Sequence, residues 1–178
     1  MTQSDKSENF FVFNVPIMRA ETGQDQVELE ECLKIFFEAE KLTGRERYHC
    51  LLCSSKRNAT KFTEIEKLPK TICISLKRFN RNGDKVSSPV SYSLSKIELK
   101  EKSGWRKYSL SGLITHHGSS VRSGHYTAFC RNPETNAWYR FSDENVQNVD
   151  SMTVRRSEAY ILQCTNRSTS WVVIEMVF

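Results

Sequence analysis

The stretch from Gly124 to Asp143, GHYTAFCRNPETNAWYRFSD, constrains the fold more than any other part of the chain. Its two halves mix β-branched, aromatic and small residues, which is typical of paired strands. Between them, the residues at 132–135, Asn-Pro-Glu-Thr, are those of a type I turn. The stretch therefore predicts a β-hairpin in which Arg131 faces Asn136 across the turn.

This register makes a partner for His125 predictable. Counting outward from the turn places His125 opposite Ser142. Directly opposed residues have Cβ atoms about 5 Å apart on one face of the sheet, which is within reach of an imidazole and a hydroxyl. A slip of one residue makes Asp143 the partner instead. A lone histidine at a strand start is more often structural, but a histidine with such a partner indicates an oriented base, and a base implies a nucleophile elsewhere.

Composition and charge narrow the class of protein. With 178 residues, 38% of them hydrophobic and 26% charged, the chain is long enough for one domain with a core. No apolar run approaches the roughly 20 residues that cross a bilayer, and the N-terminus MTQSDKSENF has no hydrophobic signal region. We therefore expect an intracellular protein, cytoplasmic or nuclear, with no membrane association. The net charge of +5 is diffuse, which argues against nucleic-acid binding.

Two of the six cysteines have the spacing of metal ligands. Cys50 and Cys53 form a C-x-x-C in YHCLLCSSKRN, which is half of a zinc knuckle. A structural zinc takes four ligands, and the chain has no second C-x-x-C. Metal binding, a redox pair and chance spacing all remain open for this motif. No secreted-scaffold spacing is present, so disulfides are not expected.

Apolar periodicity along the chain predicts one helix followed by many strands. Leu29, Cys32, Leu33 and Phe36 recur at helical spacing and indicate an amphipathic helix over 27–41. Alternation or β-rich composition predicts strands over 10–17, 60–65, 71–79, 91–99, 108–116 and 159–164. Within 108–116, the residues Tyr108, Leu110, Gly112 and Ile114 are expected on one face. The order of elements predicts an α+β fold dominated by antiparallel sheet.

Six sequence motifs then stand together in order, and together they resemble a known family. They are YHCLLC at 48–53, LPKTICISLKRF at 68–79, YSLSGLITHHG at 108–118, GHYTAFCR at 124–131, WYRFSDENV at 138–146 and AYILQC at 159–164. This set resembles the C-terminal part of the catalytic domain of ubiquitin-specific proteases. Members of that family are thiol proteases that cut the bond after the C-terminal glycine of ubiquitin. The resemblance implies a papain-like cysteine protease fold, with ubiquitin or ubiquitinated proteins as partners.

The resemblance also implies roles for individual residues. His125 resembles the catalytic histidine, and Ser142 stands where the family usually has the Asn or Asp that orients it. Asp143 matches the acidic residue that follows, so either Ser142 or Asp143 is expected to orient the imidazole. His117, Gly124 and Tyr126 are expected to bind substrate along the channel for the ubiquitin tail. The loop 118–124, bracketed by glycines, resembles a mobile loop beside that channel.

Two departures from the family pattern limit the expected function. Nothing here resembles the nucleophile box G-L-x-N-x-G-N-T-C, and the first half of the family's zinc ribbon is also missing. Cys50 and Cys53 match only its second half, so a structural zinc would have two of four ligands, and no cofactor is implied for catalysis. We therefore expect a partial domain, palm and fingers without the thumb that carries the nucleophile.

The expected organisation is a disordered N-terminus at 1–9, the partial catalytic domain at 10–165 and an atypical tail at 166–178. Such a chain is a deubiquitinase-family fragment that holds the catalytic histidine and is inactive alone. The alternative is a noncatalytic ubiquitin-binding or scaffold protein.

Overall fold

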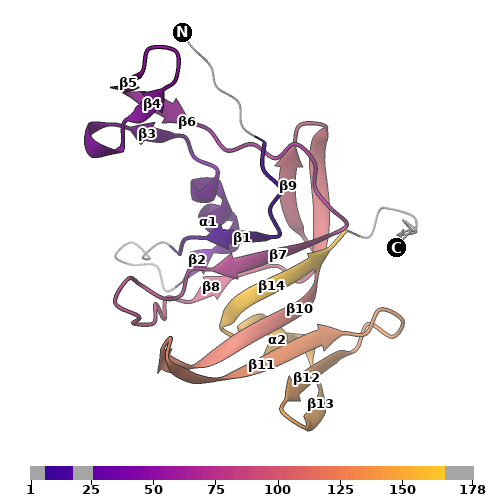
Figure 1. The fold of residues 1–178 in the computed structure, drawn as a ribbon. Helices are drawn as coiled ribbons and strands as arrows, with labels where there is room; N and C mark the ends of the chain where they lie inside the picture. The colour runs from indigo at the N-terminus through magenta and orange to yellow at the C-terminus, as the bar shows by residue number, and fades with distance from the viewer. Residues whose placement is uncertain (1–6, 18–25, 167–178) are drawn as a thin grey trace, which may run out of the picture.

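A computed structural model describes residues 7–17 and 26–166 of the chain (Figure 1). Its elements are β1 (Val12–Val15), β2 (Val27–Glu28), α1 (Leu29–Phe36), β3 (Glu40–Leu42), a 3-10 turn (Gly44–Glu46), β4 (Tyr48–Cys50), β5 (Ser55–Arg57), β6 (Ala59–Lys61), β7 (Thr71–Leu76), β8 (Val90–Ser91), β9 (Ile97–Glu101), β10 (Gly104–Ser120), β11 (Ser123–Arg131), β12 (Trp138–Ser142), β13 (Asn145–Val149), α2 (Ser151–Arg156) and β14 (Ala159–Thr165). Strands outnumber helices, as the sequence predicted.

One large sheet organises the described residues. Its strand order is β1-β7-β14-β10-β11-β12-β13, and β9 pairs with the first half of β10. All of these pairs are antiparallel except β1 with β7. Figure 1 shows β3 to β6 gathered in a small lobe that projects away from this sheet. The predicted α+β class with mainly antiparallel sheet is confirmed.

The core lies against the central strands. In β7, Ile72, Ile74 and Leu76 are buried and alternate with more exposed residues, which confirms the predicted period of two. Leu110 and Leu162 on the neighbouring strands are also fully buried. Burial of such side chains from water is the main force that holds the strands together.

The predicted helix over 27–41 is shorter than expected. α1 spans only Leu29–Phe36, with Cys32 and Leu33 buried. At its start, Val27 pairs with Val90 in the parallel β2–β8 pair, and beyond its end Glu40–Leu42 pairs with β6. Strand pairing at both ends therefore overrides the helical pattern, because tertiary contacts outweigh a weak local propensity.

The expected single face of 108–116 is divided by a β-bulge. Leu110 pairs with Cys164 and Gly112 with the next residue of β14, Gln163. β10 therefore has one extra residue, Ser111, between these two pairs. After the bulge Leu113 is buried while Ile114 is only partly buried. Placing Ile114 on one face with Leu110 was wrong, because the extra residue moves the following side chains to the other face.

The hairpin around residues 132–137 forms, but its register differs from the prediction. Arg131 pairs with Trp138 instead of facing Asn136. The Asn132 side chain accepts hydrogen bonds from two turn amides, and Asn136 adopts a positive φ of 59°, which asparagine tolerates. The turn therefore closes one residue later, between Asn132 and Ala137. The pairing shifts by two residues in total, which leaves every side chain on its expected face.

The expected terminal segments lie mostly outside the described residues. Residues 1–6 of the expected N-terminus and 167–178 of the expected tail are not described. Asn166 is buried, and its amide donates to the carbonyl of Lys70. Among the described residues no helix is long and apolar enough to cross a membrane.

Glu101 provides a test of how the β9–β10 hairpin is held to the rest of the fold. Its buried carboxylate accepts hydrogen bonds from the Ser103 hydroxyl, the Leu68 amide and Arg106, in that order of effect. These bonds hold the pKa of Glu101 at about 2, below its ordinary value of 4.5. The charged form is therefore favoured in the folded state.

We predict that Glu101→Gln lowers the thermal unfolding temperature at pH 7. Because the folded pKa is depressed, the carboxylate's stabilising contribution is fully present above pH 4.5 and is lost as the pH falls through about 2. The difference in unfolding temperature between the variant and the parent should therefore become smaller as the pH falls from 4.5 to about 2. Glu98→Gln, at the exposed ion pair with Lys107, is the control. Equal effects of the two substitutions at pH 7 would contradict the prediction.

Candidate functional site

His125 and Ser142 form the polar pair around which the candidate site is built. His125 lies near the start of β11 and Ser142 ends β12. The imidazole Nε2 and the hydroxyl Oγ are 2.8 Å apart, a hydrogen-bond distance. Because the register is shifted by two, the two residues are diagonal neighbours on one face rather than directly opposed. Diagonal neighbours remain within reach of a long side chain such as histidine.

Asp143 lies on the side of the other nitrogen of the same imidazole. It occupies the turn between β12 and β13 with a positive φ of 49°, and its side chain is 81% exposed. Its Oδ2 lies 4.0 Å from His125 Nδ1, beyond hydrogen-bond distance. Ser142 and Asp143 are therefore not equivalent, since they approach opposite edges of the ring.

His117 joins His125 on this face, whereas Tyr126 does not. His117 and His125 are directly paired across β10 and β11, and their rings are stacked with centroids 6.5 Å apart. The Nε2 of His117 is 3.1 Å from the hydroxyl of Thr115. Tyr126 follows His125 in the strand, so it points to the opposite face, where it is 53% exposed. The sequence-predicted channel residues are thus divided between two faces.

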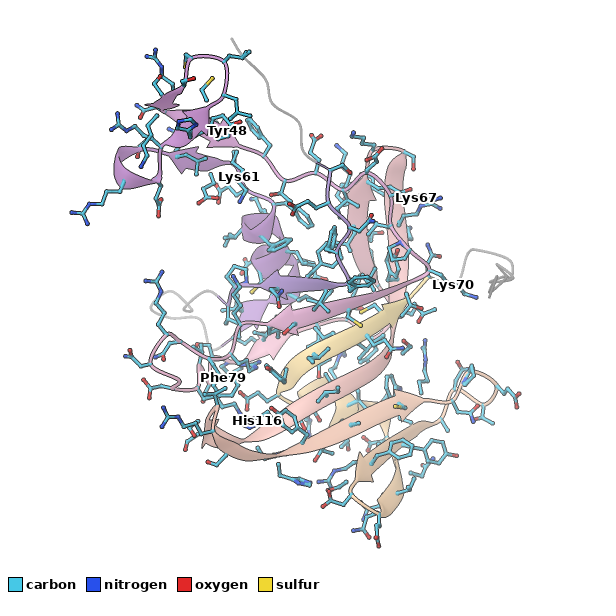
Figure 2. All side chains as sticks on the ribbon, viewed as in Figure 1. Tyr48, Lys61, Lys67, Lys70, Phe79 and His116 are labelled. Atoms are coloured by element: carbon cyan, nitrogen blue, oxygen red, sulfur yellow. The ribbon has the colours of Figure 1, made fainter. Side chains whose placement is uncertain are left out.

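His116 is a buried histidine that the sequence motifs did not single out. Only 4% of it is exposed, and its ring packs against Phe79, Tyr126 and Tyr160. Figure 2 shows Phe79 and His116 together at the end of the large sheet. Burial, and then the charge of Lys85, lower the pKa of His116 below its ordinary value, so the ring is held neutral. The alternation of segment 108–116 gave no signal for this burial, because the β-bulge between Leu110 and Gly112 breaks it.

Gly124 is required at its position by close packing. A Cβ atom there would lie 2.2 Å from the Nε2 of His116 and 2.7 Å from the carbonyl of His117. No side chain fits at such distances unless the backbone moves. Gly124 therefore fixes how closely β11 approaches His116, one residue before His125.

The segment 118–124 is not the separate loop that was expected. β10 continues to Ser120 and β11 begins at Ser123, which leaves a two-residue turn. This end of the hairpin is bonded to the neighbouring turn at 80–86. The amide of Lys85 donates to Ser119, and the amide of Val121 donates to Gly83. Hydrogen bonds from the turn at 80–86 therefore fix the backbone just before His125.

A buried charge cluster supports the same region. The Arg78 guanidinium donates to the carbonyls of Val86, Ser88 and Ala159 and forms an ion pair with Glu158 at 3.2 Å. Glu158 also binds the ammonium of Lys85 at 3.0 Å. That ammonium donates in turn to the carbonyl of His116 at 2.6 Å. Three segments distant in sequence are therefore tied together beneath the candidate site.

A cavity of about 370 Å³ lies on the face that carries His125. It separates the sheet from α2, and its lining includes Thr115, His117, Arg140, Gln147, Thr153 and Glu158. Phe129 and Val149 also line the cavity, and its exposed surface is mainly apolar although most of the lining residues are polar or charged. His125 is not among the lining residues. The face beside His117 is therefore hollowed.

Cys50 and Cys53 lie far from this site, in the projecting lobe. Cys50 ends β4, and Cys53 lies in the turn to β5 with its Sγ 3.2 Å from the Ser55 hydroxyl. Hydrogen bonds from Ser55, then Arg57 and Cys50, hold the pKa of Cys53 at about 6. Two adjacent thiols suit a soft metal such as zinc, but no group of three or more potential ligands occurs among residues 7–17 and 26–166.

Comparisons with known proteins agree with this arrangement. The family model described as "Ubiquitin carboxyl-terminal hydrolase" matches residues 1–163. A chain of the SAGA Ubp8/Sgf11/Sus1/Sgf73 DUB module bound to ubiquitin aldehyde is 30% identical, with a TM-score of 0.71, over 90% of this chain and 37% of that chain. A chain of the yeast SAGA DUB module with a mutant Sgf73 is also 30% identical, with a TM-score of 0.74, over 90% and 36%.

A third match concerns the same module bound to monoubiquitin, at 30% identity and a TM-score of 0.71. It too covers 90% of this chain and 36% of the other. The chain thus spans little more than a third of the solved chains that it matches. These matches confirm the expected ubiquitin-specific protease type of papain-like fold, present in part.

We predict that Gly124→Ala destabilises the protein and disturbs the site. The added Cβ overlaps the His116 ring, and relieving such overlaps costs about 1–3 kcal/mol. Chemical denaturation measures the loss, and NMR of the histidine rings should show shifts for both His116 and His125. Gly112→Ala is the matched control on the adjoining strand, because its Cβ would meet neighbours only at 3.5 Å or more. Similar losses for both variants would show that close packing at Gly124 is unimportant.

Proposed function

The chain belongs to the ubiquitin carboxyl-terminal hydrolase family, and from this premise we propose that it supplies the histidine half of a cysteine-type deubiquitinase site and binds the C-terminal tail of ubiquitin. The contact between His125 Nε2 and Ser142 Oγ is the observation that carries the proposal. An exposed histidine with a fixed partner, on a hollowed sheet face, has the features of a general base beside a substrate groove.

Ser142 selects the tautomer of His125. When Nε2 carries the proton and donates to Ser142 Oγ, the lone pair remains on Nδ1. Nδ1 is then the atom that takes a proton from a thiol and returns it to the leaving amine. No metal or organic cofactor enters these steps.

Asp143 has a different role, which is electrostatic. Its carboxylate lies on the Nδ1 side of the ring at 4.0 Å, so it stabilises the imidazolium that forms when Nδ1 is protonated. With its side chain 81% exposed, solvent screens much of this effect. Ser142 therefore orients the base, and Asp143 supports its charged form.

The nucleophile is not provided by a cysteine near His125. Cys32 and Cys164 are buried, Cys73 lies in β7 and is only partly exposed, and Cys50 and Cys53 lie in the projecting lobe. Cys130 shares β11 with His125, but it lies five residues away and on the opposite face. Hydrolysis therefore needs a thiol outside this set, and the chain alone binds ubiquitin without cutting it. A noncatalytic ubiquitin-binding or scaffold protein is the second candidate function.

The proposed substrate groove runs past His117 and the backbone of Gly124. Tyr126 remains a proposed residue of the tail channel, and its side chain points to the face opposite His117. The partners are ubiquitin or ubiquitinated proteins, with no nucleic acid or membrane, in the cytoplasm or nucleus. Cys50 and Cys53 serve as half of a structural zinc site.

The tautomer assignment predicts different effects for two substitutions beside the ring. At about pH 8.5, two units above the ordinary histidine pKa of about 6.5, Ser142→Ala should reduce the Nε2–H preference of His125. The separation between the two ring ¹⁵N resonances reports this preference. Asp143→Asn, the matched control, should leave it unchanged. If only Asp143→Asn alters the separation, Asp143 orients the base instead.

Calorimetric titration with ubiquitin tests the proposed function. We expect a saturable complex without turnover, and at least about tenfold weaker binding by ubiquitin lacking its C-terminal tail, a loss of about 1.4 kcal/mol. His117→Ala should weaken binding, whereas His49→Ala, at an exposed histidine of the projecting lobe, should not.

A ubiquitin with a thiol-reactive C-terminus provides the second arm of this test. It should leave all six cysteines unlabelled. Specific labelling of any cysteine would overturn the noncatalytic assignment, and the absence of any complex would overturn ubiquitin binding.

A further inference from the structure

The ribbon formed by β9 and the first half of β10 has one buried face and one exposed face. On β9, Leu99 and Glu101 are buried, whereas Lys100 between them is exposed. On β10, Trp105 pairs with Lys100 and therefore shares its face. Trp105 is 66% exposed. An indole thus lies beside a lysine on the outward face of this ribbon.

Three lysines on or beside β9 carry uncompensated charge. Lys100 lies within the strand, Lys96 directly precedes it and Lys102 directly follows it, and all three are exposed. Within residues 7–17 and 26–166, none of the three takes part in an ion pair or a side-chain hydrogen bond. The two acidic residues of β9 do not neutralise them, because both carboxylates are already paired with cations of β10. The ribbon therefore presents positive charge next to an exposed indole.

We propose that this face of the β9–β10 ribbon binds an acidic, extended segment of a partner protein. Its carboxylates would face the lysines, and one of its apolar side chains would cover Trp105. Tryptophan is enriched at the energetic centres of protein interfaces, because it buries a large apolar area and its N–H can still donate a hydrogen bond. Lysines around such a centre attract a negatively charged partner and speed its association.

The exposed indole separates this proposal from a purely protective role of the lysines. β9 pairs only with β10 among the described strands. Lysines on an open edge strand oppose pairing with a foreign sheet, but that role does not explain an indole beside them. A second copy of this chain does not suit the face either, because two positively charged ribbons repel each other.

An acidic polypeptide fits this face better than a nucleic acid does. Glu98 lies two residues from Lys100 in β9, so its carboxylate is on the same face as the lysine. A nucleic acid carries one phosphate at every nucleotide and would bring negative charge against Glu98. A polypeptide can space its carboxylates to meet the lysines and avoid that position.

The ribbon is remote from the candidate site, so both surfaces can be occupied at once. Trp105 and His117 lie near opposite ends of β10, about 40 Å apart along the strand at about 3.3 Å per residue. Figure 1 shows β9 at the end of β10 that is opposite to the turn into β11. A partner bound to the ribbon would therefore leave the face with His125 accessible. The proposal does not depend on ubiquitin recognition.

Fluorescence anisotropy with a defined probe tests the proposal on the full chain. The probe is a short fluorescein-labelled peptide in which Glu alternates with Ser and Phe takes the central position. We expect saturable binding that weakens by at least about tenfold between about 50 and about 500 mM salt, because exposed ion pairs are screened. The same peptide with Lys in place of Glu should not bind.

Matched variants test the indole and the charge separately. Trp105→Thr, which keeps a strand-forming residue, should weaken peptide binding by at least about tenfold. Phe62→Ala, at another exposed aromatic side chain, should not. Lys100→Glu should also weaken binding by at least about tenfold, whereas Lys56→Glu, at an exposed lysine of the projecting lobe, should have little effect. Circular dichroism verifies that each variant is folded.

A titration with ubiquitin in the presence of saturating peptide distinguishes this proposal from the proposed function. The affinity for ubiquitin should be unchanged, since the two surfaces lie far apart. Peptide binding without ubiquitin binding would count against the proposed function alone. Ubiquitin binding without peptide binding would count against the ribbon alone.

Four results would overturn the proposal. One is the absence of peptide binding at low salt, and another is an equal loss in Trp105→Thr and Phe62→Ala. The third is Trp105-dependent binding of a single-stranded oligonucleotide, or of vesicles that contain anionic lipid, that is tighter than binding of the peptide. The fourth is dimerisation of the chain, measured by light scattering, that Trp105→Thr abolishes.

Discussion

The fold around the candidate site depends on one buried cation, the guanidinium of Arg78. Burying a charge is costly unless it is paired and hydrogen-bonded, and here three carbonyls and the Glu158 carboxylate provide that compensation. Those carbonyls belong to the turn after β7 and to the start of β14. The same carboxylate binds Lys85, which bonds to the backbone at His116. One charge cluster thus holds the end of β10 that pairs with the start of β11, where the candidate base lies.

The support for the site and its chemistry lie on opposite faces of the same strands. His116 is buried and neutral, and it packs against Gly124 so closely that only glycine fits there. His117 and His125, the next residues along the two strands, point to the hollowed face. A buried histidine on one face therefore fixes the backbone that carries an exposed polar pair on the other, without placing the pair itself in the core.

Specific residues show how far the sequence could predict this structure. Alternation located β7, because one buried face imposes a period of two on the strand. The six-residue α2 was missed, since so short a helix carries little periodicity. The sequence feature that could have indicated this helix is Asp150, whose carboxylate caps the helix by accepting a hydrogen bond from the amide of Thr153. The hairpin register was wrong by two residues, yet His125 and Ser142 still meet, because a shift of two preserves the faces.

The sequence by itself determined most strands of the large sheet, the family and the face on which His125 and Ser142 lie, because these follow from local periodicity and motif order. It did not predict β3, β4, β5 or β13, and the strand expected over 91–99 is divided between β8 and β9. Only the tertiary structure decided which ring nitrogen each neighbour contacts, that His116 is buried, and that segment 118–124 is bonded to the turn at 80–86. Those features arise from contacts between segments far apart in the chain, such as Lys85 with His116 and Arg78 with Ala159. Local sequence patterns do not show which distant segments come into contact, so these features could not be predicted from the sequence.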